Sequence, residues 1–402
     1  MSHPGTLILI MAVAVLAPLL AYLTARRLAV PVAIFEIALG IVVGPDVLGW
    51  AHHDEIIDTL SHLGLSMLIF LAGYEIEFRT VRGDTLRRSV TAWVVTLAVA
   101  LGAAFALTGG EVAKSFVIGT ALTSTALGAV LPMLRDSGRL EGRFGTVVMA
   151  FGTVGEFGPI IAISLLLSGR SPGISTVLLC VFAAITAGAV FWALRPRPPW
   201  FSHIIAKTLH SSGQFAVRLV MLLLAAMLGL SYAFGLDTLL GAFAAGLLTR
   251  LVLAGADPEH SGEVLGRIEA MGFGFLVPFF FIVTGIDFDL DALFSGGRPL
   301  LLLPVFLLLF LLLRGGPAYL LAPRDLSRPQ RTSLALYSAT CLPLVVAIST
   351  IGLDENVLTA GEAAALVGAA MVSVLLFPLL AARLLKDGAR RTERADATRE
   401  TW

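Results

Sequence analysis

The sequence predicts an all-α polytopic membrane protein with thirteen transmembrane helices in two inverted six-helix repeats. Three observations predict this fold: the hydrophobic content, the placement of basic residues and the recurrence of short motifs. Of 402 residues, 57% are hydrophobic and 14% charged, with a mean hydropathy of +0.89. A soluble domain is nearer a quarter charged, so most of this chain is expected to lie in lipid. The 28 basic and 28 acidic residues balance, which gives no basic surface for nucleic acid.

Thirteen apolar runs approach the length of about 20 residues that spans a bilayer. The first has no basic residue before it and Arg26-Arg27 after it, the reverse of a signal peptide, so it is interpreted as a retained helix. Cys180 and Cys341 both lie in apolar runs and cannot form a disulfide framework. The runs are 6–24, 29–48, 59–76, 89–108, 113–134, 143–167, 173–194, 214–234, 236–254, 268–286, 299–322, 332–352 and 360–385.

The basic residues predict the orientation. With the N-terminus outside and the C-terminus inside, 24 of the 28 lysines and arginines fall in inner loops and the tail, as the positive-inside rule requires. Only Lys114, Arg170 and Arg298 fall outside, and Arg314 lies within a span. The outer loops are acidic instead, which is typical of solvated loops. His52 and His53 lie in one of them without a matching set of ligands, so no metal site is expected.

Two motifs recur on opposite faces of the predicted membrane. Gly-x-acid-x-acid begins at Gly73 and again at Gly285, and a glycine-spaced motif ending at Gly40 has its counterpart at Gly246. Similar sequence on opposite faces is typical of inverted repeats in secondary transporters. We therefore expect a first repeat over 1–172, a linker helix and inner loop over 173–213, a second repeat over 214–386 and a disordered cytoplasmic tail over 387–402.

The fifth and twelfth spans of this arrangement carry hydroxyls beside helix-breaking residues. Thr123, Ser124 and Thr125 precede Pro132, and Thr340 precedes Pro343. Proline removes a backbone donor, and the freed carbonyls with the hydroxyls supply hard oxygens suited to an alkali cation. A Ser/Thr-rich packing face with a plain proline kink explains the same spacing equally well.

Three charges stand out because they lie well inside predicted spans, away from the ends where charged residues are common. Glu156 is roughly 20 Å from the inner edge at 1.5 Å per residue, deep in the core, where a charge is costly and is usually functional or paired. Arg314 is at a similar depth, which makes it the natural partner of Glu156, with snorkelling to the inner surface as the alternative. Glu36 in the second span is expected to serve a helix contact or an ion funnel. A buried carboxylate near an arginine can bind a proton or a dehydrated cation, and this competition is the basis of antiport.

Several motifs together resemble the monovalent cation/proton antiporter superfamily, particularly its second branch. Val30-Pro to Gly44-Pro45 resembles the helix-two signature P-x-x-x-G-E-x-x-x-G-x-x-x-G-P, with Phe in place of the Gly before Glu36. Phe70-Leu-Ala-Gly-Tyr-Glu75 resembles F-L-A-G-L-E, and Gly241-Ala-Phe-Ala-Ala-Gly246 resembles G-A-F-x-A-G. Pro278-Phe-Phe-Phe-Ile-Val-Thr-Gly285 resembles P-x-F-F-x-x-x-G.

The resemblance implies a homodimer in the cell membrane. Helices 1–3 and 8–10 would form the scaffold and dimer part, and helices 4–6 and 11–13 a mobile core in which the broken helices five and twelve cross. It also implies that Glu156 carries the ion or proton, that Thr123, Ser124 and Thr125 line its site, and that Arg314 compensates charge.

Three departures from the pattern concern ion choice. Glu156 replaces the usual Asp, Gly155 replaces a polar neighbour, and Cys341-Leu-Pro343 carries no acid where many members have Gly-Glu. A single carboxylate favours an electroneutral exchange of one cation, Na⁺ first and K⁺ second, for one proton.

Two other functions stay open: a carrier of an organic anion or ionophore complex that Arg314 binds, and an intramembrane enzyme with Glu156 as general acid. No nucleophile–base pair supports the enzyme, and an inverted repeat disfavours a channel. No Walker or Rossmann motif predicts a nucleotide-binding domain in this chain, and no cofactor or resident metal is expected beyond the transported cation and proton.

Overall fold

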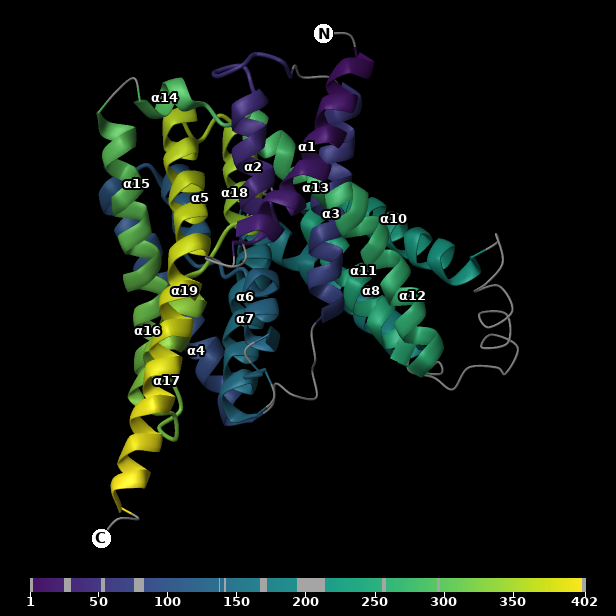
Figure 1. Cartoon of the computed structure of the whole chain (residues 1–402). Helices are drawn as coiled ribbons and strands as arrows, with labels where there is room; N and C mark the ends of the chain where they lie inside the picture. The colour runs from purple at the N-terminus through teal and green to yellow at the C-terminus, as the bar shows by residue number, and fades with distance from the viewer. Residues whose placement is uncertain are drawn as a thin grey trace. The chain divides into compact units, whose positions relative to one another are not determined.

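The computed structural model describes residues 3–24, 30–51, 55–75, 83–136, 138–140, 142–166, 172–193, 214–254, 258–294 and 297–399. Over these ranges the chain is helical with short connections and contains no β-strand (Figure 1). The sequence-based expectation of an all-α membrane protein is therefore confirmed for this part of the chain. His52, His53, Arg195, Arg197 and Lys207 lie outside the described residues.

The helices follow the predicted apolar runs closely. In the first half they are α1 (His3–Thr24), α2 (Val32–Val43), α3 (Glu55–Glu75), α4 (Asp84–Leu107), α5 (Val112–Ala121), α6 (Leu127–Asp136), α7 (Arg143–Leu166) and α8 (Pro172–Ala193). In the second half they are α10 (Phe215–Phe234), α11 (Thr238–Ala254), α12 (Pro258–Met271), α13 (Val277–Ile286), α14 (Leu290–Phe294), α15 (Arg298–Leu309), α16 (Gly316–Leu321), α17 (Arg328–Ala339), α18 (Pro343–Asp354) and α19 (Ala360–Arg399). Two π-helical turns, η1 (Gly272–Leu276) and η2 (Phe310–Gly315), join α12 to α13 and α15 to α16.

Nine helical segments of the described chain are long and apolar enough to cross a membrane. Four shorter apolar helices, over Val32–Val43, Val112–Ala121, Val177–Phe191 and Thr238–Leu253, coincide with the other predicted spans. The number of crossings and the side on which each loop lies remain predictions.

The described chain forms two compact units. Unit 1 comprises Met1–Pro18, Phe35–Ile76 and Ile160–Asp287, and unit 2 comprises Leu19–Ile34, Glu77–Pro159 and Phe288–Trp402. Each unit combines segments from both halves of the sequence. Each is described below by itself.

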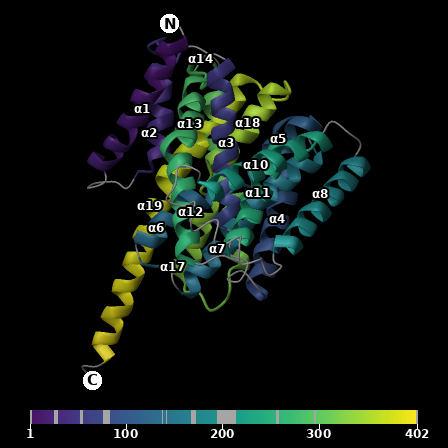
Figure 2. The ribbon, with the colours of Figure 1, turned by 90° about the vertical axis from the view of Figure 1, so that its right-hand side faces the viewer.

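Glycines set the helix packing within unit 1, where α3 lies against α11 and α13 (Figure 2). A Cβ added at Gly73 would collide with the backbone of Phe243, and one at Gly246 with the backbone of Phe70. Gly40 and Gly285 meet in the same way where α2 crosses α13. Such close approach is how membrane helices gain packing contacts without a hydrophobic drive between them. The glycines of the recurring motifs therefore serve helix crossings in this unit.

Unit 2 is organised around the long helix α19, which packs against α15, α17 and α18 (Figure 1). Helix α4 packs along α5 and α16. Most side chains of α17 and α18 are buried, including Tyr337 and Ile348. The interior of the unit is thus built from the two half-helices of the twelfth predicted span.

Two boundaries differ from the sequence-based expectation. Helix α19 continues to Arg399, whereas disorder was expected from residue 387. Seven of the thirteen residues from 387 to 399 are Ala or Arg, which have high helix propensity, so this segment can extend the helix that precedes it. The tenth span, expected from 268, begins ten residues earlier as α12 at Pro258, because an amphipathic polar turn precedes its apolar part.

Candidate ion-binding site

The fifth predicted span is broken in its middle. Helix α5 ends at Ala121 and α6 begins at Leu127. Thr123, Ser124 and Thr125 lie between them and are at most 3% exposed. The first two hydroxyls donate to carbonyl oxygens three residues earlier, each at 2.8 Å. Ser and Thr side chains compete with backbone donors in this way, which favours a break over a continuous helix.

The twelfth predicted span is broken as well. Helix α17 ends at Ala339 and α18 begins at Pro343, in the first-turn position that suits a residue without an N–H group. Between them Thr340 is extended, with φ −74° and ψ 119°, and fully buried. Pro343 thus ends one half-helix and begins the next.

The two breaks bond directly to each other. The backbone N–H of Ala126 donates to the carbonyl of Thr340 at 2.7 Å, and the Thr125 hydroxyl donates to the carbonyl of Ser338 at 2.7 Å. A broken helix leaves peptide groups without partners, and each such group costs several kcal/mol away from water. Each break therefore satisfies polar groups that the other exposes.

Helix α7 also bonds to this crossing. Proline has no N–H, so Pro159 cannot donate to the carbonyl four residues earlier, that of Gly155. That carbonyl accepts instead from the backbone N–H of Thr125 at 3.0 Å. The break in the fifth span thus supplies the donor that Pro159 lacks.

Arg314 completes the cluster from the π-helical turn η2. Its side chain is fully buried. Its Nε donates to the Thr125 hydroxyl at 3.0 Å and its Nη2 to the Phe151 carbonyl at 2.7 Å. Its Nη1 has no hydrogen-bond partner within the described ranges. The guanidinium is therefore held on two oxygens of the crossing, which excludes snorkelling to the membrane surface in this structure.

Gly155 provides the space that Arg314 occupies. A Cβ at this position would collide with Arg314 Nη2 and with the Thr125 hydroxyl. The sequence indicated only that a side chain was missing beside Glu156. In the structure, the guanidinium fills that space.

Glu156 follows Gly155 on α7 and is partly buried. On α7 the Arg314 guanidinium donates to the Phe151 carbonyl and lies against Gly155, the residue before Glu156. The pairing of Arg314 with Glu156 stays a prediction. Because side chains of adjacent helical residues point about 100° apart, depth alone did not predict this arrangement.

Glu36 lies in unit 1. It is on α2, one turn before Gly40, and is 5% exposed. The Thr123–Thr125, Gly155, Arg314 and Thr340 cluster belongs to unit 2.

Comparisons with known proteins identify the family of the chain. The sequence profile of a family described as "Sodium/hydrogen exchanger, transmembrane" matches residues 11–386. The chain belongs to this family.

Three relatives of this exchanger-family chain carry related descriptions. A putative Na⁺/H⁺ antiporter, YjbQ of Bacillus subtilis, is 25% identical over 99% of this chain and 66% of its own length. The Na⁺/H⁺-K⁺ antiporter GerN of Bacillus cereus is 24% identical over 66% of this chain and 68% of its own. A Na⁺/H⁺ antiporter of Enterococcus hirae is 24% identical over the same shares. This chain thus spans about two thirds of the length of each.

A solved structure has the same fold as this exchanger-family chain. The sodium proton antiporter MjNhaP1 of Methanocaldococcus jannaschii, at pH 8, matches with a TM-score of 0.69. The match covers 96% of this chain and all of the other at 18% identity. The family and the fold together make this a multi-pass membrane transporter, and the enzyme reading of Glu156 is set aside.

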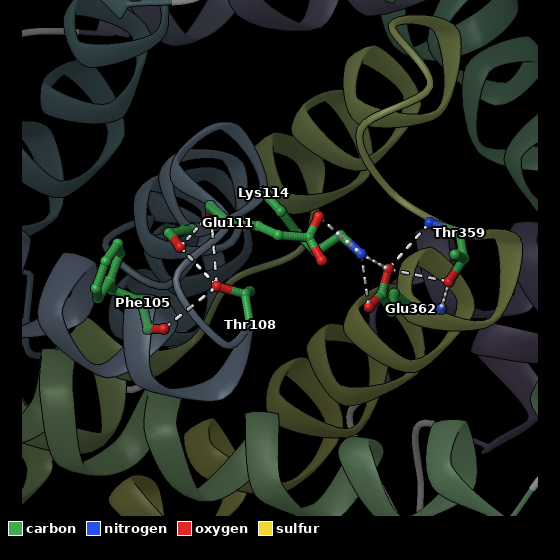
Figure 3. A network of polar contacts seen from close by, with 7 residues as sticks. Phe105, Thr108, Glu111, Lys114, Thr359 and Glu362 are labelled. Carbon is green, nitrogen blue, oxygen red and sulfur yellow. Dashed lines mark hydrogen bonds and ion pairs between the residues drawn. The ribbon is translucent and has the colours of Figure 1, made fainter.

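A polar network in unit 2 of the exchanger, away from the crossing, was not foreseen from the sequence (Figure 3). Lys114 on α5 lies 3.3 Å from Glu362 on α19, and the two side chains are only 14% and 15% exposed. Glu362 also accepts from the backbone and hydroxyl of Thr359, each at 3.0 Å. The sequence placed Lys114 in an outer loop, and nothing in the pattern links residues 248 positions apart.

The sequence also missed Ser373 and the role of Cys341. The Cys341 backbone N–H donates to the Ser373 hydroxyl at 3.1 Å, and that hydroxyl donates to the Cys341 carbonyl at 3.0 Å. The one sequence feature that could have predicted this contact was a serine within the apolar thirteenth span, which follows the predicted break in the twelfth. No group of three or more His, Cys, Asp or Glu side chains gathers as a metal site in the described ranges.

Proposed function

We propose that this chain is an antiporter that exchanges a monovalent cation for a proton across the cell membrane, with Na⁺ as the first candidate and K⁺ the second. The observation that carries the proposal is the crossing of two broken helices, bonded to each other and to the backbone of Gly155, next to Glu156. The descriptions of the relatives support the same exchange.

Glu156 is the proposed carrier. A carboxylate deep in a membrane protein binds either a proton or a dehydrated cation, because its ionised form needs a positive partner there. Proton and cation then compete for one group, and each turnover moves one in each direction. The hydroxyls of Thr123, Ser124 and Thr125 and the carbonyls of the helix-twelve break supply further hard oxygens around it.

Arg314 is the proposed compensating charge. It donates to Thr125 and Phe151, two oxygens of the crossing, so the unloaded site already holds a positive charge of the protein itself. A cation bound to the Thr125 hydroxyl would lie next to the Arg314 guanidinium, and two positive charges so close repel each other. We therefore expect cation loading to favour the release of Arg314 from this hydroxyl.

Unit 2 is the proposed moving core, and unit 1 the proposed scaffold and homodimer part. The described helices divide so that the whole crossing and Arg314 belong to one unit, which supports this assignment. The inverted repeat is supported by the matching breaks, α5–α6 in the first half and α17–α18 in the second. With one carboxylate at the site, the exchange is proposed to be electroneutral.

The test is exchange in proteoliposomes with an imposed pH gradient, following a pH-sensitive dye on addition of Na⁺, K⁺ or Li⁺. The natural chain should dissipate the gradient with one or more of these ions and should be insensitive to a valinomycin voltage clamp. Glu156→Gln should fold and lose at least about a hundredfold of the rate, since the carboxylate carries both ions.

Glu36→Gln is the matched control, because Glu36 is another acid well inside a predicted span and lies in unit 1. It should keep more than half of the rate. Full exchange by Glu156→Gln would remove Glu156 from the carrier role. No cation response by the natural chain would favour the organic-anion carrier.

A further inference from the structure

One hydroxyl at the crossing has no partner. Ser338, in the last turn of α17, is 2% exposed, and its Oγ makes no hydrogen bond within the described chain. Its backbone carbonyl, by contrast, accepts the Thr125 hydroxyl at 2.7 Å. A buried polar group without a partner costs about 1–3 kcal/mol, and such groups are rare in native proteins unless a water or ion fills the gap.

Ser338 borders a narrow hollow inside unit 2. The other residues that line it are Thr125, Leu127, Val130, Val148, Gly152 and Tyr337. In this conformation the hollow is too narrow to admit a water molecule. Water therefore cannot satisfy the Ser338 hydroxyl here, and the hollow must widen before anything polar binds in it.

The Thr125 hydroxyl already makes two hydrogen bonds. It donates to the Ser338 carbonyl and accepts from Arg314 Nε at 3.0 Å. When Arg314 releases it, Thr125 offers one oxygen to the hollow. Ser338 offers a second that requires no bond to be broken, because it has none.

We propose that the Ser338 hydroxyl is a ligand of the transported monovalent cation, which binds between Ser338 and Thr125 when the hollow opens. This inference rests on the proposed antiport and adds a side chain of the twelfth span to its site. Hard hydroxyl oxygens suit Li⁺, Na⁺ and K⁺, and the apolar walls supply no competing charge. Ser338 would then influence which of these ions the protein prefers.

Ser349 on α18 provides a matched control. It is also 2% exposed and also lacks a hydrogen-bond partner in the described chain, but it does not line the hollow. Replacing either serine by alanine removes the same atom from an equally buried place. A purely structural role of the hydroxyl predicts similar effects of the two changes.

The experiment compares Ser338→Ala and Ser349→Ala in proteoliposomes. Ser338→Ala should raise the apparent KM for the cation roughly tenfold, as loss of one polar contact of moderate strength would. It should change the order or ratio of Li⁺, Na⁺ and K⁺ and reduce the rise in melting temperature that the cation produces. Ser349→Ala should keep the KM within twofold of the natural chain and should leave the ion preference and the cation-induced rise in melting temperature unchanged.

A second pair covers the case in which Ser338→Ala is not recovered folded. Ser338→Thr and Ser338→Val have the same shape and differ by one hydroxyl, so only the threonine variant should keep cation-dependent stabilisation. Equal KM values and equal cation-induced stabilisation across each pair would overturn the proposal while the antiport itself stood. A natural chain without cation-dependent exchange would instead overturn the proposed function.

Discussion

At the scale of single residues, Gly155 decides what the site contains. The family resemblance predicted a polar side chain at position 155, so the glycine suggested that the site had lost one polar group. The structure shows that Arg314 and Thr125 occupy the space that a Cβ would take. A glycine beside Glu156, the proposed carrier, thus leaves the space in which the Arg314 guanidinium reaches the crossing.

Gly155→Ala should therefore displace Arg314 or Thr125. We expect the exchange rate to fall at least about tenfold and the melting temperature to drop, because over-packing a tight interior typically costs about 1–3 kcal/mol. Gly128→Ala on α6 is the control, since nothing lies within 4 Å of the added Cβ. It should be neutral or slightly stabilising. Unchanged transport and melting in Gly155→Ala would show that Arg314 does not need this space.

At the scale of elements, an ion pair between Lys114 and Glu362 joins the half-helix α5 to α19. Removing one partner of a largely buried ion pair leaves the other charge uncompensated. Lys114→Met should lower stability by about 1–3 kcal/mol, less than a fully buried pair would cost, and the swapped variant Lys114→Glu with Glu362→Lys should recover part of it. Thermal unfolding in detergent measures the stability of both variants. An equal loss of stability in the single and the swapped variant would contradict a pairing role.

The loop pair Arg143–Asp325 offers a contrast at the same scale. Its atoms lie 2.8 Å apart, but both side chains are about half exposed. The hydrogen bond from Arg143 lowers the pKa of Asp325. Its stabilising effect is therefore present above the unfolded-state pKa and lost as pH falls through the lowered folded-state pKa. Solvent screens this pair, so Asp325→Asn should change stability by less than about 1 kcal/mol at pH 7.

The elements also show what the sequence could and could not predict. Apolar length predicted the long helices but not α14 or the polar start of α12, and the hydroxyls at Thr123–Thr125 with Pro343 allowed either broken helices or plain kinks, of which the structure has the breaks. The bonds from Thr125 to Gly155 and Ser338 were not predictable, since they depend on the rotation of helices about their axes. The extension of α19 to Arg399 was missed because composition was given more weight than helix propensity.

At the scale of the whole molecule, the family match ends at residue 386, while α19 continues to Arg399. We expect a chain ending at Lys386 to insert, fold and exchange ions within about twofold of the full rate, since the crossing lies wholly before that point. Side-by-side reconstitution and size-exclusion chromatography check this. A truncated chain that folds but fails to transport would assign the charged segment a part in the cycle.

The hydrogen bond between Ala126 and Thr340 joins main-chain atoms. Nearly every amino acid carries the same amide and carbonyl, so substitutions at either position leave the bond intact, and only proline at 126 removes its donor. This hydrogen bond therefore depends little on which amino acids occupy the two positions. Side chains around the proposed ion site can change during evolution while the main-chain bond at the crossing is kept. This fits a chain that keeps its fold across a comparison at 18% identity.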